Sequence, residues 1–410
     1  MTRLSLAKDK ISVLLLEGIH DSAVKELRQK GYTNIETLPQ ALDEEALCHK
    51  IADIHILGIR SRTHLTDSVF AAAKKLFSVG CFCIGTSQVN TQSARKSGIP
   101  VFNAPYSNTR SVAELVLAEI IMLLRGIHEK SMSLHGGVWT KSAADSYEIR
   151  GKTLGIVGYG HIGSQLSILA EAMGMRVLFF DIEAKLAIGN AQSCESLTEL
   201  LAKSDVVSLH VPETPQTHGM IGYEQLSLCK KGAAFINASR GTVVDIYALA
   251  EFLKKKHLIG AAIDVFPVEP SSNKEEFQNP LRGLSNVILT PHIAGSTSEA
   301  QANIGNEVAR KLIEYSDNGS TLGAVNFAQV ALPVKYGGTR ILHIHRNLPG
   351  VLKQVNEVFS SRNLNIAAQY LQTDPEIGYV VVDIDGKIEE KKVIEELRQI
   401  NGTIRVRFLF

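Results

Sequence analysis

The sequence has few features of a secreted, metal-binding or membrane protein. Its five cysteines among 410 residues are an odd number without metal-ligand spacing, and Cys81 and Cys83 are too close to match the usual pairs. Buried, reduced thiols are the simpler interpretation and fit a reducing cytosol. No apolar run approaches the roughly 18 residues of a membrane span; the best candidate, residues 115–124, is broken by Glu119. We therefore expect a cytoplasmic protein that holds no metal and has no membrane partner.

An excess of charge of either sign is also missing. The chain has 43 Lys and Arg against 42 Asp and Glu, and its formal net charge is +1, so no broad basic surface predicts a nucleic-acid partner. Hydrophobic residues make up 45% and charged residues 21%, which is typical of globular proteins. A length of 410 residues exceeds one ordinary core, and about 150 residues per domain predicts two to four domains.

The most informative stretch is Leu154-Gly-Ile-Val-Gly158-Tyr-Gly160-His-Ile-Gly163. It predicts a buried strand, then glycines at G-x-G-x-x-G spacing, then a helix. Gly158 suits the tight turn, Gly160 the close approach of a pyrophosphate, and Gly163 the packing of helix on strand. The anion would lie at the helix N-terminus. This order predicts a dinucleotide-binding unit, although glycine turns between a strand and a helix are also common in proteins that bind no nucleotide.

Asp181 indicates which dinucleotide the unit binds. It follows a second predicted strand at residues 176–180, 18 residues after Gly163. Its carboxylate can accept hydrogen bonds from an adenosine ribose and would repel a 2′-phosphate. The sequence therefore predicts NAD as the cofactor.

Other α/β patterns surround this unit. Residues 11–105 alternate helical segments with strands, which predicts a flavodoxin-like parallel sheet without a glycine fingerprint. We place its strands at residues 11–16, 54–59, 81–84 and 101–103. Capping boxes at Ser111-Val-Ala-Glu114 and Ser296-Thr-Ser-Glu299 predict helices that enter and leave the nucleotide unit. The nucleotide unit would then be inserted in a discontinuous first domain.

The C-terminal residues follow a third pattern. After a flexible boundary at Gly337-Gly338, strands and helices are expected in the order βαββαβ, with the last strand at residues 404–410, as in ferredoxin-like α+β folds. The predicted architecture is α/β with three domains: a substrate-binding domain, a Rossmann-type doubly wound NAD domain inserted in it, and a ferredoxin-like domain. Their boundaries are 1–107 with 296–336, 108–295, and 337–410.

Three ionisable residues each follow a predicted strand of the nucleotide sheet, where such sheets bind ligands. Arg240 can hold a substrate carboxylate with its guanidinium fork. His292 can take the proton of a 2-hydroxy acid as hydride leaves C2. Glu269 can orient the imidazole and stabilise its charged form, while Arg240 polarises the C2 oxygen. Singly, each has a plainer interpretation: a helix-capping arginine, a solvated loop glutamate and a structural histidine. His210 also ends a strand but has no carboxylate partner, so we interpret it as structural.

A second group lies in the first domain. Arg60-Ser61-Arg62 follows the predicted strand at residues 54–59 and offers two guanidiniums and a hydroxyl. Such groups suit a phosphate or a second carboxylate, with a solvated loop as the alternative. Asn108 could assist them from the junction between the domains. These four residues are the predicted substrate-binding set.

These motifs resemble those of the D-isomer-specific 2-hydroxyacid dehydrogenases, over nearly the whole chain. The resemblance rests on Arg60-Ser-Arg-Thr-His64, Ser107-Asn-Thr-Arg-Ser-Val-Ala-Glu114, Gly158-Tyr-Gly-His-Ile-Gly163, Asn237-Ala-Ser-Arg-Gly241, Asp264-Val-Phe-Pro and Pro291-His292. It implies the branch of the family that oxidises 3-phospho-D-glycerate to 3-phosphohydroxypyruvate with NAD, the first step of L-serine biosynthesis. It places Arg240, Glu269 and His292 in the catalytic roles above.

For the cofactor, the resemblance implies contacts beyond the three glycines and Asp181. They are His161, Ile162, Ala238, Ser239, Arg240, Asp264, His292, Ile293, Ala294 and Gly295. Ala294 stands where a glycine is common, so fine packing beside the cofactor differs by one methyl group.

The stretch His343-Ile-His-Arg-Asn347-Leu-Pro-Gly-Val351 resembles an ACT regulatory domain. That resemblance implies feedback inhibition by L-serine, bound by His345, Asn347 and Asn365 where two such domains pair edge to edge. The alternative is that these residues cap turns, since Asn-x-Pro-Gly is also a turn signal. Related enzymes are homotetramers, so the resemblance implies the same assembly here.

The sequence also fits two other functions. One is a D-2-hydroxyacid dehydrogenase for another acid, such as glycerate or 2-hydroxyglutarate; reduction of 2-oxoglutarate also fits, because it presents the same carboxylate and keto groups and a distal anion. The other is a non-catalytic NAD-sensing corepressor on the same fold. The amino-acid-binding tail and the neutral charge favour the enzyme.

Overall fold

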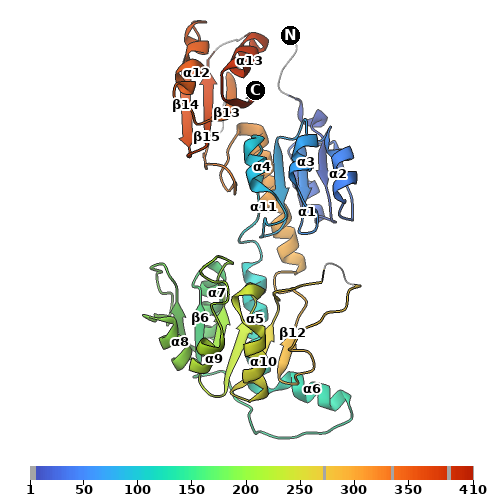
Figure 1. Cartoon of the computed structure of the whole chain (residues 1–410), viewed down its shortest axis with the longest axis vertical. Coiled ribbons are helices and arrows are strands. Elements are labelled where there is room, and N and C mark those ends of the chain that lie inside the picture. The colour runs from blue at the N-terminus through green and yellow to red at the C-terminus, as the bar shows by residue number, and fades with distance from the viewer. Residues whose placement is uncertain (1–5, 271–273, 334–336, 386–388, 410) are drawn as a thin grey trace. The chain divides into compact units, whose positions relative to one another are not determined.

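The structure is a computed structural model that describes residues 6–270, 274–333, 337–385 and 389–409 (Figure 1). Contacts divide the chain into two compact units. The first comprises Met1–Ser107 and Gln301–Phe410, and the second comprises Asn108–Ala300. The second unit is therefore an insertion in the first, and the C-terminal sheet groups with the first unit.

The first unit begins with a five-stranded parallel sheet in the order β2-β1-β3-β4-β5. This is the flavodoxin-like order. Helices α1 and α11 cover one face and α2, α3 and α4 cover the other. The bounds are β1 Val13–Leu15, α1 Asp21–Gln29, β2 Ile35–Thr37, α2 Glu44–Ile51, β3 Ile56–Ile59, α3 Asp67–Ala72, β4 Ser78–Cys81, α4 Thr91–Lys96, β5 Val101–Phe102 and α11 Ser298–Asn318.

The second unit contains a seven-stranded parallel sheet in the order β12-β11-β10-β9-β6-β7-β8. Counted within the unit, this is the Rossmann order extended by one strand. Helices α5 and α7 pack on one face, and α8, α9 and α10 pack on the other (Figure 1). The bounds are α5 Thr109–Arg125, α6 Ile127–His135, β6 Thr153–Val157, α7 His161–Ala172, β7 Arg176–Phe180, β8 Gln192–Ser193, α8 Leu197–Lys203, β9 Val206–Leu209, α9 Tyr223–Leu228, β10 Ala233–Asn237, α10 Ile246–Lys254, β11 Leu258–Ile263 and β12 Val287–Leu289.

The C-terminal part is an antiparallel sheet in the order β14-β15-β13-β16. Helices α12 and α13 cover one of its faces. Residues of the other face, among them Leu342, Ile344 and Tyr379, share a hydrophobic cluster with α1 and α11. All eight residues of β15 are consequently buried. The bounds are β13 Thr339–Arg346, α12 Val351–Ser360, β14 Ile366–Thr373, β15 Ile377–Ile384, α13 Glu390–Gln399 and β16 Thr403–Leu409.

The predicted fold class is confirmed, and several local details are wrong. Helix α5 begins at Thr109, so Ser111 lies inside the helix, where its Oγ is 2.8 Å from Oγ1 of Thr297. The second predicted capping box is displaced as well: Thr297 accepts the Ala300 N–H, and α11 starts at 298.

Strand β4 ends at Cys81, whereas the apolar run at 81–84 predicts a strand that begins there. The run misleads because Phe82 is buried against the core after the strand has ended. Parts of the predicted domains lie outside the described residues: 1–5 and 334–336 of the first domain, 271–273 of the NAD domain, and 386–388 and 410 of the C-terminal domain. No helix of the described chain has the length and apolarity that a membrane crossing requires.

Candidate active site

The glycine-rich turn has the geometry that its sequence predicts. Gly158 has φ +92°, and a Cβ there would lie 2.7 Å from the His210 carbonyl oxygen. A Cβ on Gly163 would lie 2.3 Å from the Gly158 oxygen, whereas a Cβ on Gly160 meets no atom within 4 Å. The last observation places open space beside Gly160, at the start of α7. His161 and Ile162 are the first two residues of α7, and no side chain caps its N-terminus. The turn therefore fits the diphosphate of a dinucleotide.

Asp181 follows β7 and lies beside this turn. Its carboxylate accepts hydrogen bonds from the Tyr159 N–H at 2.8 Å and the Glu183 N–H at 2.9 Å. These bonds fix the carboxylate, which still has lone pairs for ribose hydroxyls. The aromatic rings of Tyr159 and Phe179 stack on each other, with centroids 3.9 Å apart.

The predicted histidine–carboxylate pair is present in the second unit. Nδ1 of His292 lies 2.9 Å from Oε2 and 3.1 Å from Oε1 of Glu269. Because an ionised carboxylate only accepts hydrogen bonds, Nδ1 carries a proton and Nε2 is the basic nitrogen of the neutral ring. The His292 side chain is 54% exposed, so Nε2 is not sealed from a substrate.

The two groups shift each other's pKa. The hydrogen bond that His292 Nδ1 donates to Glu269 raises the pKa of His292 above its ordinary value, against the opposing effect of burial. Burial acts to raise the pKa of Glu269, but its bonds to His292 and to the Phe266 N–H outweigh this and lower it. The pair thus favours a charged imidazolium beside an ionised carboxylate, which is the state that follows proton uptake.

A buried aspartate holds the loop that carries His292. Asp264 follows β11 and is 1% exposed. Its carboxylate accepts the Ile293 N–H at 2.8 Å, the Ala294 N–H at 2.9 Å and the Thr290 hydroxyl at 2.7 Å. His292 itself has φ +54°, a left-handed conformation that is rare for a non-glycine residue. Asp264, which the sequence predicts as a cofactor contact, thus holds the loop that carries His292.

Arg240 lies on a segment that passes close to the residues after β11. It follows β10, and its charge acts on the pKa of both Glu269 and His292. The next residue, Gly241, passes so close to the segment after β11 that a Cβ would lie 2.0 Å from the Phe266 carbonyl carbon. Only glycine permits this contact, and the sequence contains no signal for it beyond the glycine itself.

The start of α5 meets the same loop. Asn108 is 8% exposed, and its Oδ1 has no hydrogen-bond partner among the described residues. A Cβ on Gly295 would lie 2.0 Å from Nδ2 of Asn108. Asn108, predicted to bind substrate, therefore lies beside the predicted cofactor residue Gly295. An unmet acceptor at this place fits a donor on a bound molecule.

The remaining predicted cofactor residues lie at strand ends of the same sheet. Ala238 and Ser239 follow β10, and the Ser239 hydroxyl donates to Oδ1 of Asn237 at 2.8 Å. Ile293 is 45% exposed next to His292. His210, interpreted as structural, contacts the Ser208 hydroxyl through Nε2 at 2.9 Å, and burial lowers its pKa to about 4. Among the described residues its Nδ1 has no partner.

In the first unit, one acidic residue organises the Arg60-Ser61-Arg62 loop. The Glu17 carboxylate, which is almost fully buried, accepts the backbone N–H groups of Arg60 at 3.0 Å, Arg62 at 3.0 Å and Thr63 at 2.9 Å. Among the described residues neither guanidinium of this loop forms an ion pair. Sequence reasoning missed Glu17, because its partners lie more than forty residues away; its only signal is an acid at the end of an apolar strand.

The predicted effector residues lie at two ends of the C-terminal sheet. His345 and Asn347 lie at the end of β13, where His345 pairs with Gly378. Asn365 precedes β14, whose Ile366 pairs with Ile384 at the other end of β15. His345 is buried with Nδ1 3.2 Å from Nδ1 of His343, and burial lowers the pKa of both rings. One chain therefore does not bring the three residues together.

Comparison with known proteins agrees with this geometry. The sequence profile of the D-isomer specific 2-hydroxyacid dehydrogenase NAD binding domain matches residues 117–294, and that of an AHAS small subunit-like ACT domain matches residues 341–405. The chain is 59% identical to D-3-phosphoglycerate dehydrogenase of Escherichia coli (strain K12), over all of both chains. It is 47% identical to the Dictyostelium discoideum protein of the same name, over 99% of each.

Solved structures give the same result. A D-2-hydroxyisocaproate dehydrogenase superposes with a TM-score of 0.69 at 25% identity, and the match covers 77% of this chain and 100% of that one. The fold, the nucleotide turn and the full-length identity thus converge. The chain belongs to the D-isomer-specific 2-hydroxyacid dehydrogenase family, with the family's NAD-binding domain and a C-terminal ACT domain.

Proposed function

We propose that the chain oxidises 3-phospho-D-glycerate to 3-phosphohydroxypyruvate with NAD, the first step of L-serine biosynthesis, in the cytoplasm. The observation that carries the chemistry is the 2.9 Å contact between His292 and Glu269, with Arg240 in electrostatic reach of both. The choice of substrate is supported by full-length relatives that bear the name of this enzyme.

Different side chains of the chain carry out different parts of the proposed reaction. Bound NAD, held at the turn of Gly158–Gly163, would supply the acceptor for the hydride that leaves C2. Nε2 of His292 takes the hydroxyl proton, and Glu269 stabilises the imidazolium so formed. Arg240 holds the substrate carboxylate and draws electron density from the C2 oxygen. The residues present fit the cofactor, because the turn at Gly158–Gly163 leaves backbone N–H groups and open space for a diphosphate.

The phosphate is assigned to Arg60, Ser61 and Arg62. Their backbone is held by Glu17, and their guanidiniums form no ion pair among the described residues, so charge is left for a ligand. Asn108 is a further proposed substrate contact.

The direct test follows NADH absorbance with phosphohydroxypyruvate as the substrate. We expect turnover, and we expect Arg60→Ala with Arg62→Ala to lower kcat/KM roughly a hundredfold, since two charge-assisted bonds are lost. Hydroxypyruvate without the phosphate is the control and should be reduced equally by wild type and variant. Equal losses on both substrates would instead favour the runner-up, a dehydrogenase for an unphosphorylated acid. 2-Oxoglutarate serves as a third substrate, and we expect slower reduction of it.

The His292→Ala variant distinguishes the proposed enzyme from a non-catalytic NAD-sensing corepressor. The enzyme loses turnover in this variant while NAD still binds, which calorimetry can measure. Turnover that survives the substitution would remove His292 from the mechanism.

We further propose L-serine inhibition at paired ACT domains of a homotetramer. Since Asn365 lies at the opposite end of β15 from His345 and Asn347, an antiparallel pairing of two copies would bring Asn365 of the partner subunit to the other two. Gly337 and Gly338, both at positive φ, are the proposed hinge that transmits serine binding to the rest of the chain.

L-serine should slow turnover and D-serine should not. Asn365→Ala should raise the L-serine concentration that is required for inhibition. Serine that binds without slowing turnover would contradict the coupling.

A further inference from the structure

The C-terminal sheet meets the first domain along a boundary that contains two hollows. Strand β16 contributes to both, because Leu409 lines one and Arg405 and Arg407 line the other. The two hollows differ sharply in charge, although all their lining residues belong to the first unit.

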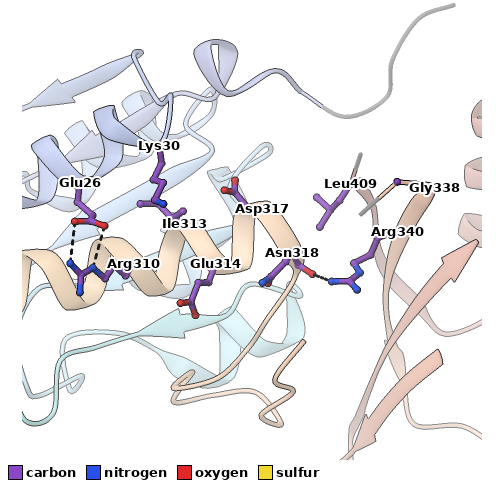
Figure 2. Close-up of a pocket in the computed structure, with 11 residues that line it drawn as sticks. Glu26, Lys30, Arg310, Ile313, Glu314, Asp317, Asn318, Gly338, Arg340 and Leu409 are labelled. Carbon is purple, nitrogen blue, oxygen red and sulfur yellow. Dashed lines mark hydrogen bonds and ion pairs between the residues drawn. The ribbon is translucent and has the colours of Figure 1, made fainter. Parts of the chain in front are cut away.

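The first hollow, of about 570 Å³, is electrically balanced (Figure 2). Arg310 bonds to Glu26 at 3.2 Å, and Arg340 donates to the Asn318 carbonyl at 3.1 Å. Asp317 is paired with Lys8 at 2.6 Å. Three basic and three acidic side chains line this space, so it offers no net charge to a ligand.

The second hollow, of about 410 Å³, has only basic ionisable groups in its lining. Two lysines come from the segment after α3, and three arginines come from the C-terminal part: Lys74, Lys75, Arg398, Arg405 and Arg407. Lys75 is paired with Asp53 at 2.6 Å. No ion pair among the described residues involves Lys74, Arg398, Arg405 or Arg407.

Two of these arginines are fixed in place by neutral partners. Arg405 donates to the Leu76 carbonyl. The Arg407 guanidinium lies 3.8 Å from the centre of the Phe77 ring and 5.2 Å from that of Tyr315. Its Nη2 donates weakly to the Ser316 carbonyl at 3.4 Å, while Nη1 is buried without a partner in the described part of the chain. These contacts hold the arginines without neutralising them.

Neighbouring groups respond to the excess of positive charge. Burial lowers the pKa of Arg405; Tyr315 acts to raise it, and the charge of Arg407 acts to lower it. Burial also lowers the pKa of the nearby His55, and the charges of Lys75 and Arg407 add to the effect, with Asp53 opposing. An anion in the hollow would relieve this repulsion.

We propose that this basic hollow is a binding site for a small phosphate-type dianion, either free phosphate or the phosphate group of a short monoester. Planar guanidinium forks match tetrahedral oxyanions, and the volume admits a phosphate with a few further atoms. A bound dianion would join the segment after α3 to β16, and so link the first domain to the C-terminal sheet. The site is separate from the Arg60–Arg62 loop and does not depend on the proposed reaction.

The test uses two exposed residues whose loss leaves the packed arginines intact. Lys74→Gln with Arg398→Gln removes two charges from the hollow, and Lys25→Gln with Lys391→Gln removes two exposed charges elsewhere in the same unit. Titration calorimetry with inorganic phosphate, at an ionic strength held constant with sodium chloride, gives the affinity. We expect the first pair to bind at least about tenfold more weakly than the control pair. Phosphate binding at Arg60 and Arg62 is common to both pairs and cancels in the comparison.

A second titration with glycerol 3-phosphate decides the source of the anion: tighter binding than inorganic phosphate assigns the site to monoesters, and equal or weaker binding assigns it to free phosphate. Matching thermal unfolding in chloride alone shows that both pairs are folded. Equal phosphate affinities in the two pairs, or no phosphate heat in the wild type, would overturn the proposal.

Discussion

At the scale of single residues, the pH dependence of turnover follows from the His292–Glu269 pair. Glu269 raises the pKa of His292, and reduction of a keto acid requires the protonated ring. Reduction should therefore decline as the pH rises through that raised pKa. Glu269→Gln lowers the pKa, so the decline should move to lower pH, and kcat should fall roughly a hundredfold.

The control for this change is Glu251→Gln, which removes an exposed carboxylate of the same unit. Steady-state rates across the pH range provide the measurement. A profile of Glu269→Gln that lies at the same pH as the wild type, merely scaled down, would show that Glu269 does not set the protonation of His292.

The buried carboxyl group of Glu119 should make the stability of the fold depend on pH. It is 2% exposed in α5, neither carboxylate oxygen has a partner among the described residues, and burial together with the charge of Asp264 raises its pKa to about 8. The folded state thus holds this proton more tightly than the unfolded state. The free energy of unfolding must fall as pH rises from the ordinary glutamate pKa of 4.5 through about 8, by on the order of 5 kcal/mol in total.

Glu119→Gln should abolish this loss, whereas Glu114→Gln, an exposed change in the same helix, should keep it. Urea unfolding of the three proteins at acidic, neutral and alkaline pH measures the difference. If the wild type and Glu119→Gln lose stability in parallel, Glu119 is not the titrating group.

At the scale of elements, the approach of the β10 and β11 segments sets the position of Arg240. Gly241→Ala places a Cβ 2.0 Å from the Phe266 carbonyl carbon, so the segment that leads to Glu269 must shift. We expect a loss of about 1–3 kcal/mol in stability and a larger relative loss of kcat. Gly222→Ala is the control, because its Cβ would meet nothing nearer than 3.7 Å. Circular dichroism melts and rate assays check both effects, and unchanged turnover in Gly241→Ala would refute the positioning role.

The sequence predicts some helices and strands well and others poorly. Apolar runs predict β6, β7, β9 and β10 well, because buried parallel strands are nearly continuous in hydrophobic residues. Helix starts are predicted poorly around residue 108, because Asn108, Thr109 and Ser111 can all cap a helix and only tertiary contacts choose among them. Strands β2 and β8 escape prediction because they are short and largely exposed.

Some residues of the candidate site can likewise be predicted from the sequence, and others cannot. His292, Glu269 and Arg240 are predictable since each follows an apolar strand of one sheet. The supports are not: Glu17 acts on backbone groups more than forty residues away, and the role of Asp264 as a brace depends on a loop whose shape the sequence does not reveal. Residue type indicates the chemistry, whereas position in the folded chain decides which groups hold it in place.

At the scale of the whole molecule, Arg340 joins the C-terminal sheet to the end of α11. Arg340 is 1% exposed and donates to both oxygens of Asp383 at 2.7 Å and to the carbonyls of Asn318 and Pro333 at 3.1 Å. Arg340→Met removes the buried guanidinium that pairs with Asp383 and should cost about 3–5 kcal/mol. Adding Asp383→Leu should restore much of that loss. Differential scanning calorimetry checks both, and a double variant no more stable than the single one would contradict this account.

The route of the chain has a consequence for engineering. The two ends of the inserted unit are neighbours. Oγ of Ser111 and Oγ1 of Thr297 are 2.8 Å apart, and Gly295 is in close contact with Asn108. A gene fragment spanning residues 108–300 could therefore be excised and its termini joined by a short tether. The resulting circular protein would keep the complete seven-stranded sheet, a self-contained receptor for the coenzyme without the rest of the polypeptide.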